Sequence, residues 1–219
     1  MSQSTLQTNF YQVKNSLPTH VQLVAVSKTH PVSAIQELYE CGQRKFGENR
    51  VQELTEKQPM LPADVQWHLI GHLQTNKVKY IAPFISIIES VDSEKLLTEI
   101  NRQAEKNNRQ INVLLQIKIA EEDAKTGMET GDALELLNRC ENGEFPNVKI
   151  QGLMGMATFT EDEKQIEKEF RFLKDFYDSV QKQYQFSILS MGMSSDYELA
   201  VRCGSTSVRV GSAIFGHRN

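Results

Sequence analysis

The sequence predicts an α/β fold, a single (β/α)8 TIM barrel with an additional N-terminal helix. Short runs rich in Val and Ile alternate with longer stretches whose apolar residues recur at helical spacing, which is the pattern of βαβ units. Eight such runs follow one another without an obvious linker, so we expect one domain over residues 1–219 and a closed barrel. The expected strands are Val21–Ser27, Lys45–Glu48, Gln66–Ile70, Ile85–Glu89, Asn112–Lys118, Lys149–Met154, Ser187–Met191 and Ser207–Val210.

The helices are predicted from apolar side chains spaced three or four residues apart. The first helix between strands begins near Pro31, because proline suits the first turn of a helix. Ahead of the first strand, a further set at this spacing predicts the extra helix, which would close the bottom or the side of the barrel. The expected packing faces are Leu6, Phe10, Val13 and Leu17; Leu96, Leu97, Ile100 and Ala104; Leu134, Leu137 and Cys140; and Ile166, Phe170, Leu173, Tyr177 and Val180.

Composition and charge argue against several classes of protein. Apolar residues make up 39% and charged residues 24%, with a net charge of −4, which is an ordinary globular composition. No cluster of Lys and Arg stands out, so nucleic acid is not an expected partner. Cys41, Cys140 and Cys203 are odd in number and widely spaced, without a C-x-x-C pair, which predicts buried thiols in a reducing compartment. Because the sequence has neither a signal segment nor an apolar run of about 18 residues, we expect a cytoplasmic protein without a membrane partner.

An open, doubly wound sheet is the alternative fold. A nucleotide-binding sheet of that kind usually carries G-x-G-x-x-G after its first strand. Here the position reads Ser27-Lys28-Thr29-His30-Pro31, which contains no glycine. The sequence therefore favours the barrel and does not support a dinucleotide.

Two loops near the end of the sequence have the composition of a phosphate site. In (β/α)8 barrels, phosphate is commonly held by the loops after strands seven and eight. Here these loops read Met191-Gly192-Met193-Ser194-Ser195-Asp196 and Gly211-Ser212-Ala213-Ile214-Phe215-Gly216. Glycine lets backbone N–H groups approach closely, and a helix N-terminus presents unpaired donors. Either loop alone fits an ordinary turn with a helix cap, whereas the two together predict an anion cradle.

Lys28 directly follows the first strand, which lies beside the eighth strand in a closed barrel. A lysine there is either a solvated surface charge or an amine that reaches the centre of the site. Partial burial and nearby cations disfavour the ammonium form, and the neutral amine attacks an aldehyde to give an imine. An amine beside a phosphate cradle suits an aldehyde that carries a phosphate, and pyridoxal 5′-phosphate (PLP) is such a molecule.

Arg209 and Asn49 are two further candidates, each with an alternative. Arg209 lies at the end of the eighth strand, and its guanidinium keeps its proton. Beside a pyridine nitrogen it would donate a hydrogen bond and keep that nitrogen unprotonated, or else it would form a salt bridge at the barrel rim. Asn49 follows the second strand, where it would bond the cofactor's phenolic oxygen or cap the next helix.

His68 and His72 are the remaining candidates for chemistry, and they bracket Leu69-Ile70-Gly71. They are not part of an H-E-x-x-H motif, and no third ligand lies at suitable spacing. We therefore expect no metal site and assign both histidines to the barrel interior or to loops.

Several motifs spread over nearly the whole sequence carry a family resemblance. They are Ala25-Val26-Ser27-Lys28-Thr29, Phe46-Gly47-Glu48-Asn49 with Gln52-Glu53, Trp67-His68, Gly71-His72-Leu73-Gln74-Thr75-Asn76-Lys77, Gly152-Leu153-Met154-Gly155-Met156, Leu189-Ser190-Met191-Gly192-Met193-Ser194, and Val208-Arg209-Val210-Gly211 with Ile214-Phe215-Gly216. They resemble the motifs of the PLP-binding proteins, also called PLP homeostasis proteins. Ala120-Glu121 departs from the asparagine that many members carry, but neither residue is assigned to the cofactor.

The resemblance implies a barrel related to the N-terminal domain of alanine racemase. It implies PLP as a Schiff base on Lys28, with Arg209 facing the pyridine nitrogen and Asn49 as a neighbouring contact. The phosphate cradle maps to Ser194, Ser195, Gly211 and Ser212. The family is associated with vitamin B6 homeostasis rather than with an established turnover.

The sequence is compatible with three functions. The first is a carrier or regulator that protects PLP and delivers it to PLP-dependent apo-enzymes. The second is a racemase-like enzyme, which needs an acid–base group on each face of the substrate, whereas Lys28 supplies one. In alanine racemases the other is a tyrosine of a C-terminal β-domain acting across a dimer, and the sequence stops at Asn219. We therefore expect a carrier without catalytic residues, and a monomer. The third is a lysine-dependent aldolase for a sugar phosphate, which would be isolated without a chromophore.

Overall fold

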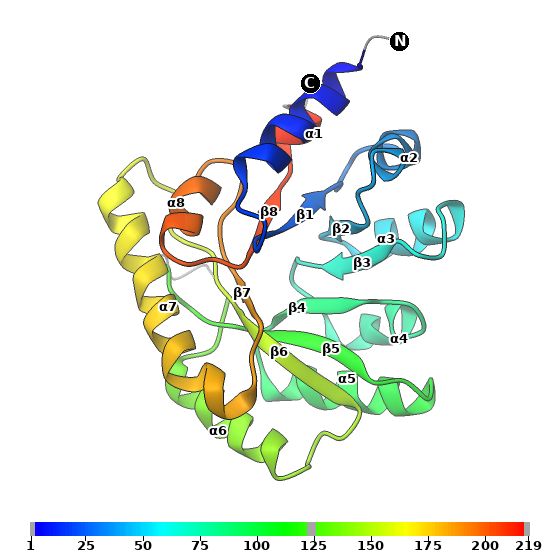
Figure 1. Cartoon of the computed structure of the whole chain (residues 1–219). Coiled ribbons are helices and arrows are strands. Elements are labelled where there is room, and N and C mark those ends of the chain that lie inside the picture. Colours follow the sequence, from blue (N-terminus) through cyan, green and yellow to red (C-terminus); the bar gives the residue numbers. More distant parts are fainter. Residues whose placement is uncertain (1–2, 122–125, 217–219) are drawn as a thin grey trace.

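The computed structural model describes residues 3–121 and 126–216 and contains a closed barrel of parallel strands in the order β1 to β8 (Figure 1). The predicted (β/α)8 fold is therefore confirmed. The strands are β1 Gln22–Val26, β2 Lys45–Glu48, β3 Gln66–Leu69, β4 Ile87–Val91, β5 Ile111–Gln116, β6 Val148–Met154, β7 Ile188–Ser190 and β8 Ser207–Val210.

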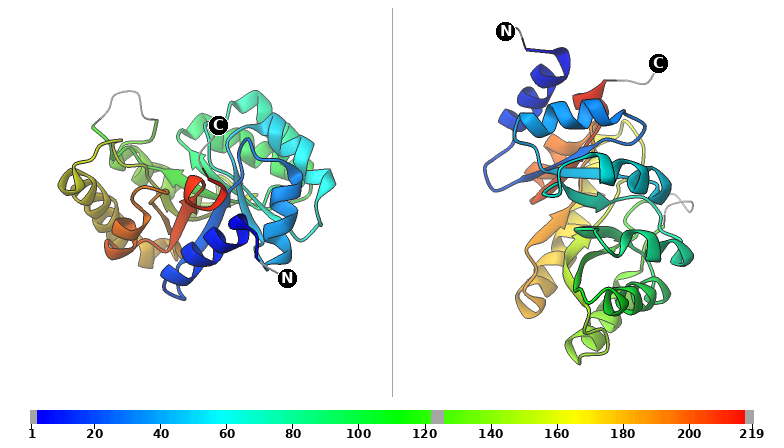
Figure 2. Two further views of the ribbon diagram at one scale, coloured as in Figure 1. Left: turned by 90° about the horizontal axis from the view of Figure 1, so that it is seen from above. Right: turned by 90° about the vertical axis from the view of Figure 1, so that its right-hand side faces the viewer.

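Helices surround this barrel, as the views in Figure 2 show. They are α1 Thr5–Ser16, α2 Val32–Glu40, α3 Val51–Lys57, α4 Val78–Ile81, α5 Glu94–Lys106, α6 Thr130–Glu141, α7 Glu163–Tyr184, α8 Tyr197–Arg202 and α9 Ser212–Phe215, with 3₁₀ turns η1 Gln58–Met60 and η2 Thr75–Lys77. Within the described ranges, no helix combines the length and the apolar composition that a bilayer crossing needs.

The barrel closes where β1 pairs with β8, with Val24 opposite Arg209 and Ala25 opposite Val210. Parallel pairing sets the carboxyl ends of both strands at the same edge of the sheet. The segment after β1 therefore lies beside the segment after β8, which is the arrangement that the sequence predicted for Lys28 and the second cradle loop.

The additional N-terminal helix is present as α1, and it packs against α2 and α9. A capping box begins it, because the Ser4 hydroxyl accepts the backbone N–H of Gln7 and the Gln7 side chain accepts that of Ser4. Phe10 and Val13 are buried, as the spacing predicted. The Asn9 amide donates to the Ile214 carbonyl of α9 at 3.2 Å, so α1 holds the segment after β8 from the side of the barrel.

Most of the predicted strand bounds shift by one or two residues, as in β5, which ends at Gln116 rather than Lys118. Two of the differences have a clear physical cause. Strand β4 begins at Ile87 rather than Ile85, because the N–H of Ile85 donates to the Ile81 carbonyl at 2.9 Å and so belongs to the turn after α4. On α6 the buried face is Ala133, Leu136 and Leu137, and Leu134 is exposed. Leu137 is therefore buried as predicted, but the packed face extends to Ala133 and Leu136 rather than to Leu134.

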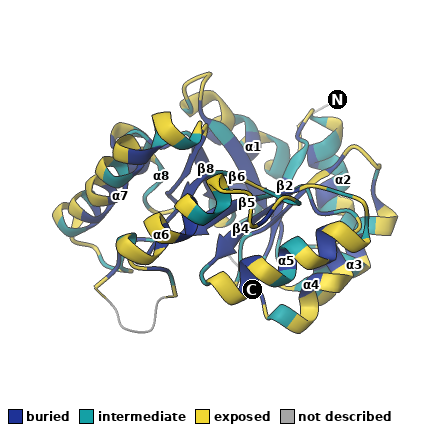
Figure 3. Cartoon of the chain, turned by 90° about the horizontal axis from the view of Figure 1, so that it is seen from below, coloured by how far each residue is buried: buried dark blue, intermediate teal, exposed yellow. Residues whose placement is uncertain are grey.

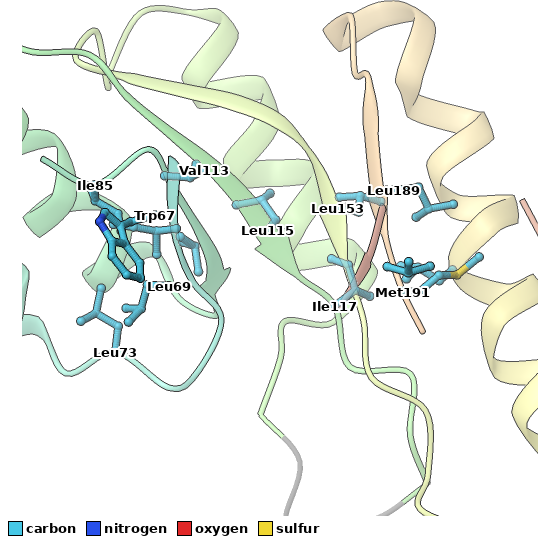
Figure 4. Packing of buried hydrophobic residues seen from close by; sticks show 14 of the residues in the cluster. Trp67, Leu69, Leu73, Ile85, Val113, Leu115, Ile117, Leu153, Leu189 and Met191 are labelled. Atoms are coloured by element: carbon cyan, nitrogen blue, oxygen red, sulfur yellow. The ribbon is translucent and has the colours of Figure 1, made fainter. Parts of the chain in front are cut away.

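The buried side chains form two separate cores. The larger core lies between the barrel and its helices, and the strands of the barrel are coloured mainly as buried in the ribbon of Figure 3. In Figure 4 Leu115 and Leu153, which are register partners on β5 and β6, point into this layer, and Trp67 packs beside Leu69 and Ile85. The smaller core is Ile87, Leu114, Met154 and Ile188.

The smaller core lies inside the barrel, beneath a set of polar groups. Ser190 on β7 donates to Glu89 on β4 at 2.6 Å, and strands that are not neighbours can meet in this way only across the interior. Because alternate residues of a strand face the same side, Ile188 and Ile87 share that interior with Ser190 and Glu89. The barrel interior is therefore apolar at one level and polar at the level nearer the carboxyl ends of the strands.

Candidate functional site

A cavity of about 980 Å³ opens at the carboxyl ends of the strands, where (β/α)8 barrels carry their active sites. The loops after β1, β2, β3, β7 and β8 contribute to its lining. All seven residues singled out from the sequence line this one cavity: Lys28, Asn49, Ser194, Ser195, Arg209, Gly211 and Ser212. The structure thus brings the whole predicted set together.

Lys28 lies in a tight turn directly after β1. The N–H of His30 donates to the carbonyl of Ser27 at 3.1 Å, which closes a four-residue turn with Lys28 and Thr29 at its centre. Thr29 has a φ of 67°, a left-handed conformation that is unusual for a β-branched residue. Lys28 itself is half-buried on the cavity wall.

The loops after β7 and β8 are joined by hydrogen bonds that converge on one oxygen. The hydroxyl of Ser194 accepts the backbone N–H of Gly211 at 3.0 Å and that of Ala213 at 3.4 Å. Ser195 and Ser212 are exposed on the same cavity wall. Backbone N–H donors that converge on one oxygen, with hydroxyls beside them, form an environment that suits the oxygens of a phosphate group.

Gly192 explains why the loop after β7 can turn so closely onto α8. Its φ is 99°, and a Cβ on this residue would lie 2.6 Å from the Cβ of Ala200. A side chain at this position would push α8 away from the loop that carries Ser194 and Ser195. The helix after this loop, α8, begins at Tyr197, with Asp196 as its N-cap.

Arg209 is buried at the floor of the cavity, with only 3% of its surface exposed. It donates to the Ser190 hydroxyl and, at 3.0 Å, to the Gly155 carbonyl, and one guanidinium nitrogen lies 3.8 Å from a Glu89 oxygen. The alternative of a salt bridge at the rim is therefore wrong in location, because the ion pair lies inside the barrel. A buried guanidinium needs such an anion, since an unpaired charge in the interior is costly.

Glu89 is held as that anion by three partners. Burial alone would raise its pKa, but the hydrogen bond and charge of His68, the charge of Arg209 and the hydrogen bond from the Ser190 hydroxyl lower the pKa below the ordinary glutamate value. The His68 ring nitrogen Nδ1 lies 2.6 Å from one carboxylate oxygen, and Ser190 donates to the other. The negative charge stabilises the guanidinium next to it.

Asn49 does not cap the next helix, contrary to the alternative weighed from the sequence. The N-cap of α3 is Arg50, and no side chain caps it. Asn49 lies against Gly71 instead, where a Cβ on Gly71 would come within 2.5 Å of the Asn49 carbonyl oxygen. This close approach between the ends of β2 and β3 fixes Asn49 on the cavity wall.

The two histidines lie where the sequence analysis assigned them. His68 is in the barrel interior beside Glu89, and His72 is exposed in the loop after β3, 3.2 Å from Asp92. Among the described residues, no group of three or more His, Cys, Asp or Glu side chains is arranged to hold a metal ion.

Sequence reasoning missed several residues of the cavity wall. His30 stacks on Phe215 with ring centroids 4.6 Å apart, and Gln116, Met156 and Met193 line other parts of the cavity. Gln116 ends β5, so the rule that barrel sites lie at strand carboxyl ends would have indicated it. The stacking of His30 depends on the contact between the β1 and β8 loops and has no signal in the sequence.

The comparisons with known proteins agree with this geometry. The family model described as alanine racemase, N-terminal domain, matches residues 1–219. A pyridoxal phosphate homeostasis protein of Aquifex aeolicus is 41% identical over 200 residues, which are 90% of this chain and 87% of that protein. The solved structure of PipY from Synechococcus elongatus with PLP bound is 37% identical, has a TM-score of 0.88, and is matched over 96% of this chain and 100% of that one. The chain belongs to the alanine racemase N-terminal domain family and, within it, to the pyridoxal phosphate homeostasis proteins.

Alanine racemases themselves are more distant. The enzyme of E. faecalis is 13% identical with a TM-score of 0.81, and the match covers 98% of this chain and 58% of that one. At this level of identity the likeness shows a shared barrel fold and nothing of the activity.

Proposed function

We propose that this protein holds PLP as a Schiff base on Lys28 and serves intracellular PLP homeostasis. The observation that carries the proposal is one cavity in which a half-buried lysine, a buried arginine and two loops rich in hydroxyl and N–H donors face each other. Relatives at 36% to 41% identity are named pyridoxal phosphate homeostasis proteins, and PipY has been solved with PLP bound.

The residues around the cavity suit the phosphate, the pyridine nitrogen and the ring of PLP. The donors of Gly211 and Ser212, with the hydroxyls of Ser194 and Ser195, would hold the phosphate. Arg209 would face the pyridine nitrogen, and Asn49 would contact the ring nearby. The support for the phosphate end is that two backbone N–H groups already point at a single oxygen, that of Ser194.

The chain's own residues argue for storage rather than turnover. PLP supplies an aldehyde, with which a neutral Lys28 amine condenses with the loss of water. Glu89 keeps Arg209 charged, and a guanidinium donates hydrogen bonds without releasing a proton. A pyridine nitrogen held beside it would stay unprotonated, and the ring would then draw electrons only weakly. This favours a carrier over a racemase-like enzyme.

We further infer that the protein acts in the cytoplasm as a monomer and passes PLP to apo-enzymes. The three cysteines are free thiols, which suits a reducing compartment. The cavity opens to solvent at the strand ends, so the bound aldehyde would be within reach of an acceptor protein.

A titration of the purified chain with PLP tests the function. We expect a visible absorbance band that saturates at one PLP per chain, and a fall in this band as an added B6-dependent apo-enzyme gains activity. Arg209→Met should weaken the band at equal PLP, whereas Arg102→Met on the outer surface should not. A chain that gives no band at saturating PLP would contradict the proposal.

A further inference from the structure

A buried lysine lies beneath the turn that carries Lys28. Lys57 is the last residue of α3, and only 6% of its surface is exposed, although a lysine at a helix end is usually solvated. Its ammonium makes three hydrogen bonds, to the Ser27 carbonyl at 2.8 Å, to Glu48 Oε1 at 2.8 Å and to Glu53 Oε1 at 2.6 Å. These bonds use all three of its donors.

Two of these bonds control the backbone on either side of Lys28. The Ser27 carbonyl, which belongs to the peptide group before Lys28, accepts directly from Lys57. The N–H of Thr29, which belongs to the peptide group after Lys28, donates to the same Glu53 oxygen that Lys57 binds. Both peptide groups of Lys28 are therefore tied to one buried ammonium.

The turn needs such support because Thr29 is held in an unfavourable conformation. Its φ of 67° is positive, as at the third residue of a type II turn, where glycine or asparagine is usual. A β-branched residue persists there only when its surroundings fix it. The bond from Thr29 to Glu53 and the bond from Lys57 to Ser27 supply that restraint.

We propose that Lys57 and Glu53 are positioning residues that clamp the Ser27–His30 turn and thereby aim the Lys28 amine into the cavity. The proposal rests on the proposed function, because it concerns the reach of Lys28 to PLP. Glu48 completes the clamp, since its Oε1 also accepts from the Ser27 hydroxyl at 2.7 Å. None of the three touches the cavity, so their effect on the imine is indirect.

The test separates covalent attachment from cofactor binding. The rate of imine formation at saturating PLP is followed by visible absorbance. The non-covalent affinity is measured with pyridoxine 5′-phosphate, which lacks the aldehyde. Lys57→Met and Glu53→Ala are compared with the wild type and with Lys106→Met, which alters an exposed lysine at the last position of α5.

We expect imine formation to slow by about tenfold or more in Lys57→Met and Glu53→Ala, since small misplacements of a reacting group have large effects on rate. The affinity for pyridoxine 5′-phosphate should stay within about twofold, because the phosphate cradle comes from other loops. Lys106→Met should match the wild type in both measurements.

A second change makes the test specific to the turn. Glycine adopts a positive φ without strain, so Thr29→Gly added to Glu53→Ala should restore much of the lost rate. If Lys57→Met does not fold, the two Glu53→Ala variants decide the matter. The clamp would be overturned by a wild-type rate of imine formation in Glu53→Ala, or by no recovery of that rate with Thr29→Gly. Equal losses in the rate and in the affinity for pyridoxine 5′-phosphate would also overturn it. A wild type that forms no imine at Lys28 would instead overturn the proposed function.

Discussion

Two buried carboxylates, Glu48 on β2 and Glu89 on β4, have surroundings that shift their pKa in opposite directions. Glu89 has a partner on each oxygen, and its pKa is lowered. Glu48 is fully buried, and burial raises its pKa despite the hydrogen bonds from Lys57 and Ser27. Both of those bonds fall on Oε1, and among the described residues Oε2 of Glu48 has no hydrogen-bond partner.

The contrast shows that burial alone does not decide the charge of a carboxyl group. Glu89 is a fixed anion because a guanidinium, an imidazole and a hydroxyl all favour its charged form. Glu48 is only half compensated, so it tolerates a proton more readily. We infer that the first carboxylate sets the charge of the cavity floor, whereas the second mainly contributes geometry beneath the Lys28 turn.

The largest expected effect is on Glu89. Glu89→Gln removes the anion opposite Arg209, and breaking a buried ion pair by neutralising one member typically costs roughly 3–5 kcal/mol of unfolding free energy. Urea unfolding near neutral pH measures this loss. A loss below about 1 kcal/mol would show that Arg209 does not depend on Glu89 for its charge.

The hydroxyls of Ser190 and Ser27, which donate to Glu89 and Glu48, allow a second comparison of the two carboxylates. Ser190→Ala leaves one Glu89 oxygen and one Arg209 donor unpaired, which we expect to cost roughly 1–3 kcal/mol. Ser27→Ala removes one of two donors from a Glu48 oxygen that keeps Lys57, so about 1 kcal/mol is expected. The two variants are measured side by side by urea unfolding, and a larger loss in Ser27→Ala would reverse the assignment.

Glu48→Gln should have the smallest effect near neutral pH. The amide oxygen can still accept from Lys57, and a raised pKa means that the ionised carboxylate is poorly stabilised by the fold. We expect the unfolding free energy to change by no more than about 1 kcal/mol. A loss comparable to that of Glu89→Gln would contradict the proposed difference between the two sites.

The pH dependence of the two substitutions should have opposite signs. The lowered pKa of Glu89 stabilises the wild type above the ordinary value of 4.5, and this advantage over Glu89→Gln shrinks as pH falls through the lowered pKa. The raised pKa of Glu48 stabilises the wild type below 4.5, and this advantage over Glu48→Gln is lost as pH rises through the raised pKa. Unfolding free energies measured from about pH 2 to about pH 8 would reveal the two slopes.

The sequence indicated the barrel and the cavity residues better than it indicated their supports. The alternation of strands and helices, with the rule that sites lie at strand carboxyl ends, was enough to bring Lys28, Arg209 and the two cradle loops together. Lys57 and Glu53 look like an ordinary exposed pair on one helix face, spaced four residues apart. That the lysine is buried depends on the packing of α3 against the β1 turn, which no local pattern encodes.

The location of Arg209 illustrates the same limit. Its place at the end of β8 suggested either a cofactor contact or a rim salt bridge, and its partner Glu89 is 120 residues earlier on a strand across the barrel. Only the tertiary structure shows that the ion pair of Arg209 lies inside the barrel rather than at its rim. Leu134 was wrongly predicted to be buried for a similar reason, because helical spacing allows more than one apolar face.

Borohydride reduction of the PLP-loaded wild type, followed by peptide mass mapping, tests the central claim most directly. The account predicts a stable pyridoxyl adduct, one per chain, on the peptide that contains Lys28. An adduct on any other lysine, with the Lys28 peptide unmodified, would contradict it.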